Sequence, residues 1–467
     1  INTSVDVINF PEECLNIRAP HYLPDGNIIF FYKKQGIDDR FIGIIDDEGK
    51  NFKTIFRGNL TNVYRSNGIR LMPFKNNKKV FIGDYILDCS KSFSEATQDE
   101  CTLRLVVYPK EVQELGKLFV WSEILIAPDN EHIVWTTLYS TNFAYNFIAK
   151  LYDDGKKQNY TLTNVKVIST LNFVEQRIDE KGNITLIPQD IIGGEVKQFL
   201  NGGNKITVAG TLTHGFGFSM LQNLESKEFT ALNPFEPGYE ETTILSPDEK
   251  LGIAMSTRFS PNTSFAILDL IPRPYSAYIL SKITMFVYQF CVNNVRNGNP
   301  GNIGPALYDI KKASEDPSYH GIPLYENQKD GKESRWVFTS PMSWHPSGLK
   351  AIWPTCVRGD KETRRLNKVT ISNYSPSSIP EIKNTTENIP YAFPLEELSN
   401  KTILKEIDGY IKGKNKGQIH YFKNDTNNSA SFEYLEFSDD GKNVYNGVEG
   451  FYGEGIKGIY YANVTVK

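Results

Sequence analysis

The chain has 467 residues, a formal net charge of −4 and 40% hydrophobic residues, which is the composition of a folded globular protein. The weak negative charge, without a basic stripe, argues against nucleic acid as a partner. The longest apolar runs, such as FAILDLI at 265–271, are too short to cross a bilayer, so no membrane partner is expected.

The start of the chain and its sequons predict a secreted protein. The first residue is Ile1, as after removal of a secretory signal. Asn-x-Ser/Thr sequons recur in polar stretches, which predicts N-linked glycans and an extracellular or secretory-lumen location. The sequons are at Asn2, Asn59, Asn159, Asn183, Asn262, Asn373, Asn384, Asn400, Asn424, Asn427 and Asn463.

In chain order, the strongest signal is a turn followed by alternating apolar residues. Such a pattern predicts a β-hairpin, because Pro, Asp, Asn and Gly preset the turn and the period of two indicates a strand. A third strand such as RFIGIID (40–46) and a fourth such as NFKTIF (51–56) follow several copies. The copies are HYLPDGNIIFFY (21–32), MPFKNNKKVFIG (72–83), LIAPDNEHIVW (125–135), QFLNGGNKITVAG (198–210), LSPDEKLGIAM (245–255), SWHPSGLKAIW (343–353) and EFSDDGKNVYNGV (436–448).

The repeated unit is a four-stranded meander of roughly 40–50 residues, the size of a propeller blade. LPDGNIIFF, LSPDEKLGIAM and FSDDGKNVY resemble the Ser-Pro-Asp-Gly-Lys turns of TolB-like and WD40-like β-propellers. This resemblance implies an all-β, seven-bladed propeller of four-stranded blades, with residues 1–467 as one domain. We expect SVDVINF (4–10) to join GIKGIYYANVTV (455–466) in the last blade, because closure removes the exposed sheet edges.

Two stretches depart from the repeat. Cys89 and Cys101 flank a polar excursion, which predicts a disulfide between them. The pairing of Cys14, Cys291 and Cys356 stays open. Residues 276–335 are extra between blades 5 and 6, and they predict either a lid or a segment packed on the outer face.

Aligning the repeats at their turns predicts which residues face the central channel. Two positions before the turn every copy is apolar, which predicts core between blades. Six positions before it, polar groups recur that are too costly to bury unpaired, so we expect them to rim one mouth of the channel. That ring is Arg18, Arg70, Ser122, Val196, Glu241, Ser340 and Glu433, and Glu123, Lys197 and Tyr434 lie one position later.

The ring suggests several roles, each with a structural alternative. Arg18 and Arg70 would clamp a carboxylate or phosphate, unless Arg18 simply pairs with Glu433. Glu241 would be an acid or base opposite Glu123 or Glu433, or else a solvated channel carboxylate.

The remaining candidates are histidines and aromatic residues near the channel. His214, in the Gly-flanked loop GTLTHGFGF, is the most suggestive proton shuttle, and His21 would line the channel. Trp121 and Tyr434 would stack on a ligand ring, although most aromatic residues must be core. The predicted catalytic groups are therefore Arg70, His214 and Glu241, with Arg18, His21, Trp121, Glu123, Lys197, Ser340, Glu433 and Tyr434 as ligand-binding candidates.

The motifs present favour a small-molecule enzyme. No G-x-S-x-G, P-loop, dinucleotide fingerprint, H-E-x-x-H or Cys/His metal spacing occurs, so neither a cofactor nor a metal is expected. The overall plan is similar to secreted fungal hetero-Diels–Alderases and to saponin-type glycoside hydrolases. That resemblance implies cyclisation of a small organic substrate, with glycoside hydrolysis as the alternative. A non-catalytic carbohydrate- or protein-binding propeller is the other alternative, but the unequal rim residues favour one asymmetric site.

Overall fold

The computed structural model describes residues 1–61, 63–64, 70–116, 119–139, 143–153, 155, 159–210, 219–235, 239–260, 273–276, 278–279, 288–325, 334–401, 403–453 and 457–467. For 114–116, 119–123, 138–139, 143, 289–290 and 399–400 it describes the backbone alone.

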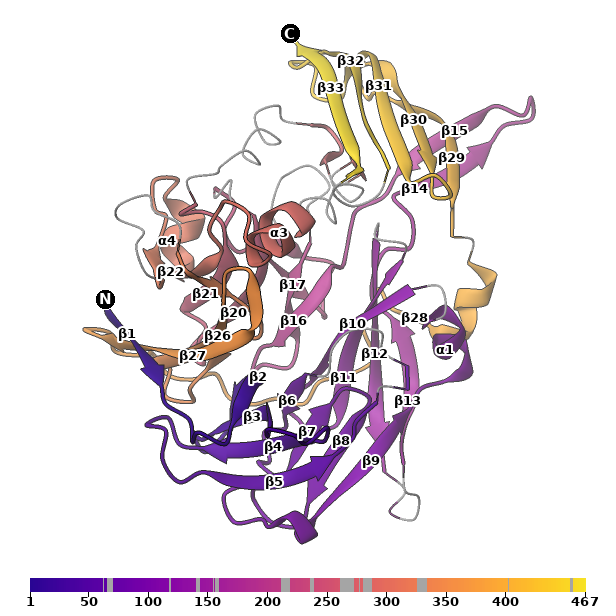
Figure 1. The fold of residues 1–467 in the computed structure, drawn as a ribbon. Helices are drawn as coiled ribbons and strands as arrows, with labels where there is room; N and C mark the ends of the chain where they lie inside the picture. Colours follow the sequence, from indigo (N-terminus) through magenta and orange to yellow (C-terminus); the bar gives the residue numbers. More distant parts are fainter. Residues whose placement is uncertain are drawn as a thin grey trace.

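Most strands belong to six antiparallel units that follow one another along the chain (Figure 1). The last strands of the second and third units also pair with each other, in parallel, so these two units form one sheet. In the first five units, four strands pair in sequence order. The first unit is β2 (Leu15–Tyr22), β3 (Ile28–Lys33), β4 (Arg40–Ile45) and β5 (Lys53–Gly58); the second is β6 (Leu71–Pro73), β7 (Lys79–Ile82), β8 (Tyr85–Cys89) and β9 (Cys101–Val107); the third is β10 (Phe119–Ile126), β11 (His132–Tyr139), β12 (Phe143–Tyr152) and β13 (Tyr160–Val167). The fourth is β16 (Glu195–Phe199), β17 (Lys205–Ala209), β18 (Ser219–Asn223) and β19 (Phe229–Ala231), and the fifth is β20 (Glu240–Leu245), β21 (Leu251–Ser256), β22 (Gly304–Asp309) and β23 (Ile322–Pro323).

The N-terminal strand completes the sixth unit. Its inner edge consists of β24 (Trp336–Phe338) and β25 (Ser343–Trp344), which both pair with β26 (Lys350–Val357). β26 pairs with β27 (Asp360–Ser372), and β27 pairs with β1 (Asn2–Ile8) from Asn2↔Ser372 to Ile8↔Leu366. The expected pairing of the N-terminal strand with residues 455–466 is therefore wrong, although this strand does complete a unit.

The inner strands of the six units form a closed ring. β2 contacts β6, β6 contacts β10, β10 contacts β16, β16 contacts β20, β20 contacts β25, and β25 contacts β2. Apolar clusters fill the spaces between neighbouring units; one of them joins Ile29 of the first unit to Val80 of the second, and another joins Ile28 of the first unit to Ile352 of the sixth. Radial units around one axis are the architecture of a β-propeller, so the predicted propeller is confirmed as a fold class; the described residues form six such units.

The seventh turn copy belongs to a separate sheet. This seven-stranded sheet stands beside the ring (Figure 1). It includes a hairpin that is formed by the stretch of chain between the third and fourth units. Its strands are β14 (Val174–Ile178), β15 (Ile184–Pro188), β29 (Glu406–Lys412), β30 (Lys416–Asn424), β31 (Ser429–Ser438), β32 (Tyr445–Tyr452) and β33 (Ile459–Val466). The chain thus differs from the single seven-bladed domain that its repeats predict.

The reason for this difference is that turn chemistry is local. In the seventh copy, Asp440 Oδ1 accepts hydrogen bonds from the backbone N–H groups of Lys442 and Asn443 at 2.8 Å. In the first copy, Asp25 Oδ1 accepts one from Asn27 in the same way. Both turns specify a hairpin, but neither specifies the sheet that the hairpin joins.

The predicted insertion also lies elsewhere. Residues 276–335 include β22 and β23, which pair within the fifth unit, so the extra chain separates β21 from β22 rather than two blades. In its described part, Val292 and Val295 are buried in the core shared with the sixth unit. The described part of this segment thus packs against the fifth and sixth units.

Within the described ranges, the remaining elements are short. They are η1 (Gln98–Glu100), α1 (Lys110–Gly116), η3 (Gln289–Asn293), α3 (Asn294–Arg296), α4 (Ile310–Glu315), β28 (Phe393–Pro394) and η5 (Leu395–Asn400). None of the helices within the described ranges is long and apolar enough to cross a membrane.

The predicted disulfide is confirmed. Cys89 and Cys101 are bonded, joining β8 to β9. The thiols of Cys14, Cys291 and Cys356 are free and buried.

Candidate functional site

A cavity of about 420 Å³ lies at the centre of the ring, a size that suits a small organic ligand. Every unit contributes to its lining, so groups far apart in the sequence meet there. One contributor from each unit, in order, is His21, Arg70, Leu125, Lys197, Thr242 and Ser340.

The turns that follow the inner strands border the cavity. Pro24, Pro128, Pro247 and Pro346 of these turns are among its lining residues. Ile379 and Ile382 also line it, and they come from the segment 373–392, which we call the strap. The strap leaves the sixth unit after β27 and crosses the turn side of the ring before reaching β28.

Three units of the ring anchor the strap. Tyr374 and Ser377 donate hydrogen bonds to Asp248 Oδ2 of the fifth unit, at 2.6 and 2.9 Å. Thr385 Oγ1 donates to the Gly203 carbonyl of the fourth unit at 2.8 Å. In the third unit, His132 lies between two carboxylates: Nδ1 is 2.7 Å from Asp129 Oδ2, and Nε2 is 2.8 Å from Glu387 Oε2 of the strap.

The apolar wall comes from the positions two residues before each turn. All six of these residues in the ring are buried, as the repeats predict for a core. The structure adds that five of them also line the cavity: Tyr22, Ile126, Leu200, Leu245 and Trp344.

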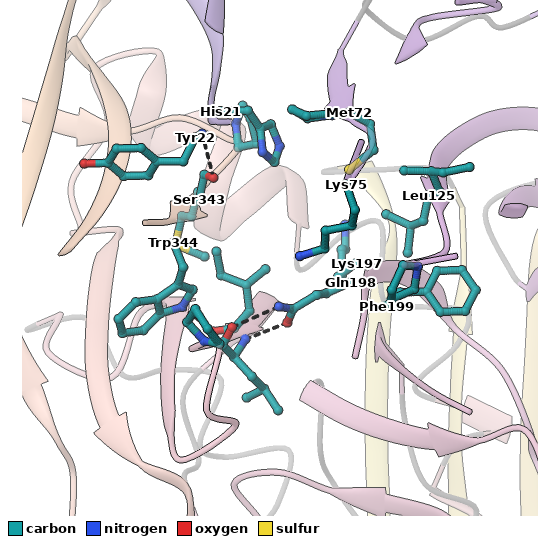
Figure 2. A pocket seen from close by; sticks show the side chains of 18 of the residues that line it. His21, Tyr22, Met72, Lys75, Leu125, Lys197, Gln198, Phe199, Ser343 and Trp344 are labelled. Carbon is teal, nitrogen blue, oxygen red and sulfur yellow. Dashed lines mark hydrogen bonds between the residues drawn. The ribbon is translucent and has the colours of Figure 1, made fainter. Parts of the chain in front are cut away.

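Hydrogen bonds between units hold this wall in place (Figure 2). The Gln198 side chain donates to the Leu245 carbonyl at 2.9 Å and accepts from the Leu245 N–H at 2.6 Å. Trp344 Nε1 donates to the Ile244 carbonyl at 3.1 Å. Ser343 Oγ accepts from the Tyr22 N–H at 2.9 Å. These bonds link the fourth, fifth, sixth and first units, so the cavity is preorganised.

Lys75 extends into the cavity (Figure 2). The residue as a whole is exposed. Among the described residues, no hydrogen bond or ion pair joins its amino group to a partner. The surrounding protein desolvates the ammonium form and so lowers the pKa of Lys75.

Lys197, by contrast, is a paired lysine. Its side chain is 3% exposed, and Nζ lies 2.6 Å from Glu195 Oε2 and 3.8 Å from Glu241 Oε1. Burial raises the pKa of Glu241; Lys197, and more weakly Arg296 and Arg70, oppose that rise.

Irregular pairing of the inner strands brings Lys197 and Glu241 together. The ladder between β16 and β17 shifts register between Val196 and Gln198, and the ladder between β20 and β21 shifts between Glu240 and Thr242. Lys197 and Glu241 are the residues left out of the ladders. A bulged residue no longer follows the alternation of its strand, which is how both reach the same place.

Arg70 and Ser340 line the cavity together. Arg70 Nη2 donates a hydrogen bond to Ser340 Oγ at 3.4 Å, which joins the second unit to the sixth. With His21 and Lys197, they are the predicted site residues that the structure places on the cavity.

Four predicted site residues are not among those that line the cavity. One of them is Glu241, which lies beside Lys197 of the lining. Arg18 is 44% exposed, and its Nη2 is 2.9 Å from Glu362 Oε1 of the sixth unit, so Glu433 is not its partner. Glu433 belongs to β31 of the separate sheet and is 56% exposed. Tyr434 is buried in that sheet and donates to Glu449 Oε1 at 2.6 Å, which is a structural role.

Three more predicted residues lie outside what is described. His214 is among the undescribed residues, and for Trp121 and Glu123 only the backbone is described, within β10.

Alternation alone overlooks Lys75. This residue lies one position before its turn, where a regular strand would direct it away from the channel. One signal was available: in the six ring units that position holds Leu23, Lys75, Ala127, Asn201, Ser246 and His345, so Lys75 is its only lysine.

The charged side chains of the lining are mostly cationic. No group of three or more His, Cys, Asp or Glu side chains in the described part of the chain is arranged to hold a metal ion. The lining carries three cationic side chains, Arg70, Lys75 and Lys197, and one carboxylate, Glu249. Burial raises the pKa of Glu249, which weakens its negative charge further.

Comparisons with known proteins do not identify a family for this chain. No family model matches it, and no curated protein does. Prolyl oligopeptidase B from Galerina marginata is 9% identical over 90% of this chain and 56% of its own, with a TM-score of 0.35. This chain thus spans about half the length of the prolyl oligopeptidase chains that it matches.

Two further solved structures are also only distantly similar to this chain. Oligogalacturonate lyase from Vibrio parahaemolyticus is 10% identical over 80% of this chain and 97% of its own, with a TM-score of 0.40. TolB from Acinetobacter baumannii is 12% identical over 80% and 66%, with a TM-score of 0.29. At such similarity, the assignment to the β-propellers depends on the closed ring of inner strands.

Proposed function

We propose that this protein is a propeller enzyme that binds a small organic substrate in its central cavity. One observation carries the proposal: the lining is largely apolar, yet it contains the cationic side chains of Arg70, Lys75 and Lys197, the last of which is paired with Glu195 and Glu241. Such a site favours a molecule with an apolar body and an anionic or carbonyl oxygen.

The chemistry that we propose is polarisation of that oxygen. Fixed cations in a partly desolvated cavity stabilise negative charge that develops on a carbonyl oxygen during cyclisation or addition. A wall held by hydrogen bonds between units keeps the reacting atoms close, which favours cyclisation of a flexible substrate.

Glycoside hydrolysis is a second candidate, and one observation favours it. Burial raises the pKa of Glu241, as a general acid requires, and Glu195 provides a second carboxylate across Lys197. Glu433, the partner that the sequence suggests for Glu241, lies in the other sheet. The cavity lining does not include Glu241, so we rank this candidate second.

We also propose that the protein is secreted and glycosylated. Exposure of the sequons supports this, since the transferring enzyme needs accessible asparagines. Asn159 and Asn424 are partly buried, and Asn262 and Asn400 have no described side chain. The exposed ones are Asn2, Asn59, Asn183, Asn373, Asn384, Asn427 and Asn463. A loss of mass on enzymatic removal of N-glycans from the source protein would test it.

The binding proposal is tested with benzoate and 2-naphthoate, which combine an apolar ring with an anionic oxygen. We expect both to raise the melting temperature, and benzylamine to have no effect. Arg70→Ala should abolish the shift, whereas Arg177→Ala, an exposed arginine of β14, should retain it. Equal shifts in wild type and Arg70→Ala would contradict the cavity as the binding site.

Catalysis is tested with small-molecule extract from the source of the protein. We expect the wild type to consume at least one component, detected by mass spectrometry, and Arg70→Ala not to consume it. Loss of a sugar from the consumed component would favour hydrolysis, whereas an isomer of equal mass would favour cyclisation. Binding without consumption would identify a non-catalytic propeller.

A further inference from the structure

We propose that Lys75 is a nucleophilic amine that forms an imine with an aldehyde or ketone bound in the cavity. The inference rests on the proposed function, since it assigns a substrate class to the same site. It adds a covalent step to what polarisation by cations would do.

The position of Lys75 carries the proposal. The side chain lines the cavity and extends into it (Figure 2), beside walls provided by Met72, Leu125 and Phe199. An apolar molecule held by these walls would present its carbonyl group to the amino group at a high effective concentration.

The state of the amino group supports this role. Lys197, the other lysine of the lining, is held by Glu195 and Glu241, so it is unsuited to attack a carbonyl. Lys75 has no such carboxylate partner within the described chain. Desolvation by the surrounding protein also lowers the pKa of Lys75, which increases the fraction of neutral, nucleophilic amine at neutral pH.

The chemical step balances without an oxidant or reductant. The Nζ lone pair of Lys75 attacks the carbonyl carbon, and a proton moves from nitrogen to the former carbonyl oxygen, giving a carbinolamine. The hydroxyl group then leaves as water after taking a proton from the solvent that reaches the cavity, and a carbon–nitrogen double bond forms as an iminium. The iminium returns its N–H proton to the solvent, which gives the neutral imine. The net change is amine plus carbonyl compound to imine plus water.

Reductive trapping tests the proposal directly. The wild-type protein is treated with benzaldehyde and cyanoborohydride at pH 7, and peptide mapping gives the rate at which each lysine gains a benzyl group. We expect Lys75 to react on the order of tenfold faster than Lys78, because the cavity holds the aldehyde beside the Lys75 amino group at a high effective concentration. Lys78 is an exposed lysine of the same turn, which makes it a matched reference.

Two controls locate the reaction. Lys75→Met should lose the fast adduct and Lys78→Met should keep it, with unchanged far-ultraviolet circular dichroism in both. Benzoate, which occupies the cavity but forms no imine, should slow labelling of Lys75 and leave that of Lys78 unchanged.

The outcomes separate this proposal from the proposed function. Equal labelling rates at Lys75 and Lys78, or fast labelling of Lys75 that benzoate does not slow, would overturn the imine. If benzoate still raised the melting temperature of wild type but not of Arg70→Ala, binding in the cavity would stand without it. If benzoate did not bind, the proposed function itself would fail.

Discussion

At the residue scale, two lysines have different roles in the central cavity. Lys75 and Lys197 both line it, but Lys197 neutralises two carboxylates in the wall, while Lys75 is exposed and has no such pair. A buried carboxylate that loses its cation is costly, whereas an exposed ammonium is easily replaced. The two lysines should therefore respond differently to the same substitution.

Lys197→Met should lower the free energy of unfolding by about 3 kcal/mol, because it leaves Glu195 and Glu241 without their cation. Lys75→Met should change it by less than about 0.5 kcal/mol. Urea denaturation of both variants measures the difference. Equal losses would mean that the ion pairs of Lys197 add nothing to the stability of the ring.

The Gln198 side-chain amide should also contribute measurably to the free energy of unfolding. Gln198→Ala removes both hydrogen bonds to the Leu245 backbone and should cost about 2 kcal/mol, since the buried Leu245 N–H and carbonyl lose their partners. Gln418→Ala in β30 is the matched control, because no hydrogen bond of its side chain is described there. Urea denaturation again gives the values, and similar losses in both variants would contradict a role for the link between units.

At the element scale, the strap is the part of the cavity that depends most on titratable contacts. Its link to the third unit is His132, buried between Asp129 and Glu387, with Glu131 and Lys150 nearby. Burial opposes protonation of His132, but the hydrogen bonds with Asp129 and Glu387 outweigh it and raise the pKa of His132.

This arrangement predicts a direction of pH dependence. A group with a raised pKa stabilises the fold fully below its unfolded pKa of about 6.5 and loses that contribution as the pH rises through the folded pKa. The difference in unfolding free energy between wild type and His132→Gln should thus be largest near pH 6 and smaller at pH 9. Asp129 and Glu387 have lowered pKa values, so their contribution is lost only in acid.

Chemical denaturation at a series of pH values measures this difference, and the exposed His320→Gln serves as control. A wild-type advantage that stays constant from pH 6 to pH 9 would show that protonation of His132 does not hold the strap.

At the scale of the whole molecule, the ring and the seven-stranded sheet have separate roles, although their turns share one sequence pattern. The ring holds the cavity and closes through β1 on β27, whereas the seven-stranded sheet packs around another cluster, including Tyr421, Phe432 and Tyr434. Phe451 of this sheet also joins the core of the fifth and sixth units. Ring closure matters because an uncovered β27 would present a long free edge.

Deleting residues 1–8 should therefore lower the melting temperature of the ring and promote aggregation, measured by light scattering. Deleting residues 459–467, which form β33 of the other sheet, should leave the benzoate-induced shift in melting temperature intact. Loss of that shift in the second deletion would contradict the separation of the two sheets.

The comparison of prediction with structure separates local from non-local information. Local turn chemistry identified every repeated hairpin, the propeller class and the burial of residues such as Tyr22 and Leu245. It also favoured the Cys89–Cys101 disulfide, because the two cysteines flank a short excursion. Local turn chemistry did not predict the place of the seventh copy, because the same turn closes a hairpin in the ring and in the seven-stranded sheet.

The candidate site was only partly predictable, for a different reason. Counting along the strands placed Arg70, Lys197 and Ser340 near the channel but misplaced Arg18 and overlooked Lys75. Register shifts such as those at Lys197 and Glu241 reverse the alternation on which such counting depends.

The sequence by itself determined the hairpins, the strand character and the apolar faces, because these depend on neighbours a few residues apart. Only the tertiary structure decided which strand closes the ring, which copy leaves it, and which charges meet in the cavity. Those outcomes depend on packing between segments hundreds of residues apart, where bulges and competing sheet edges select one arrangement among several that local patterns allow equally.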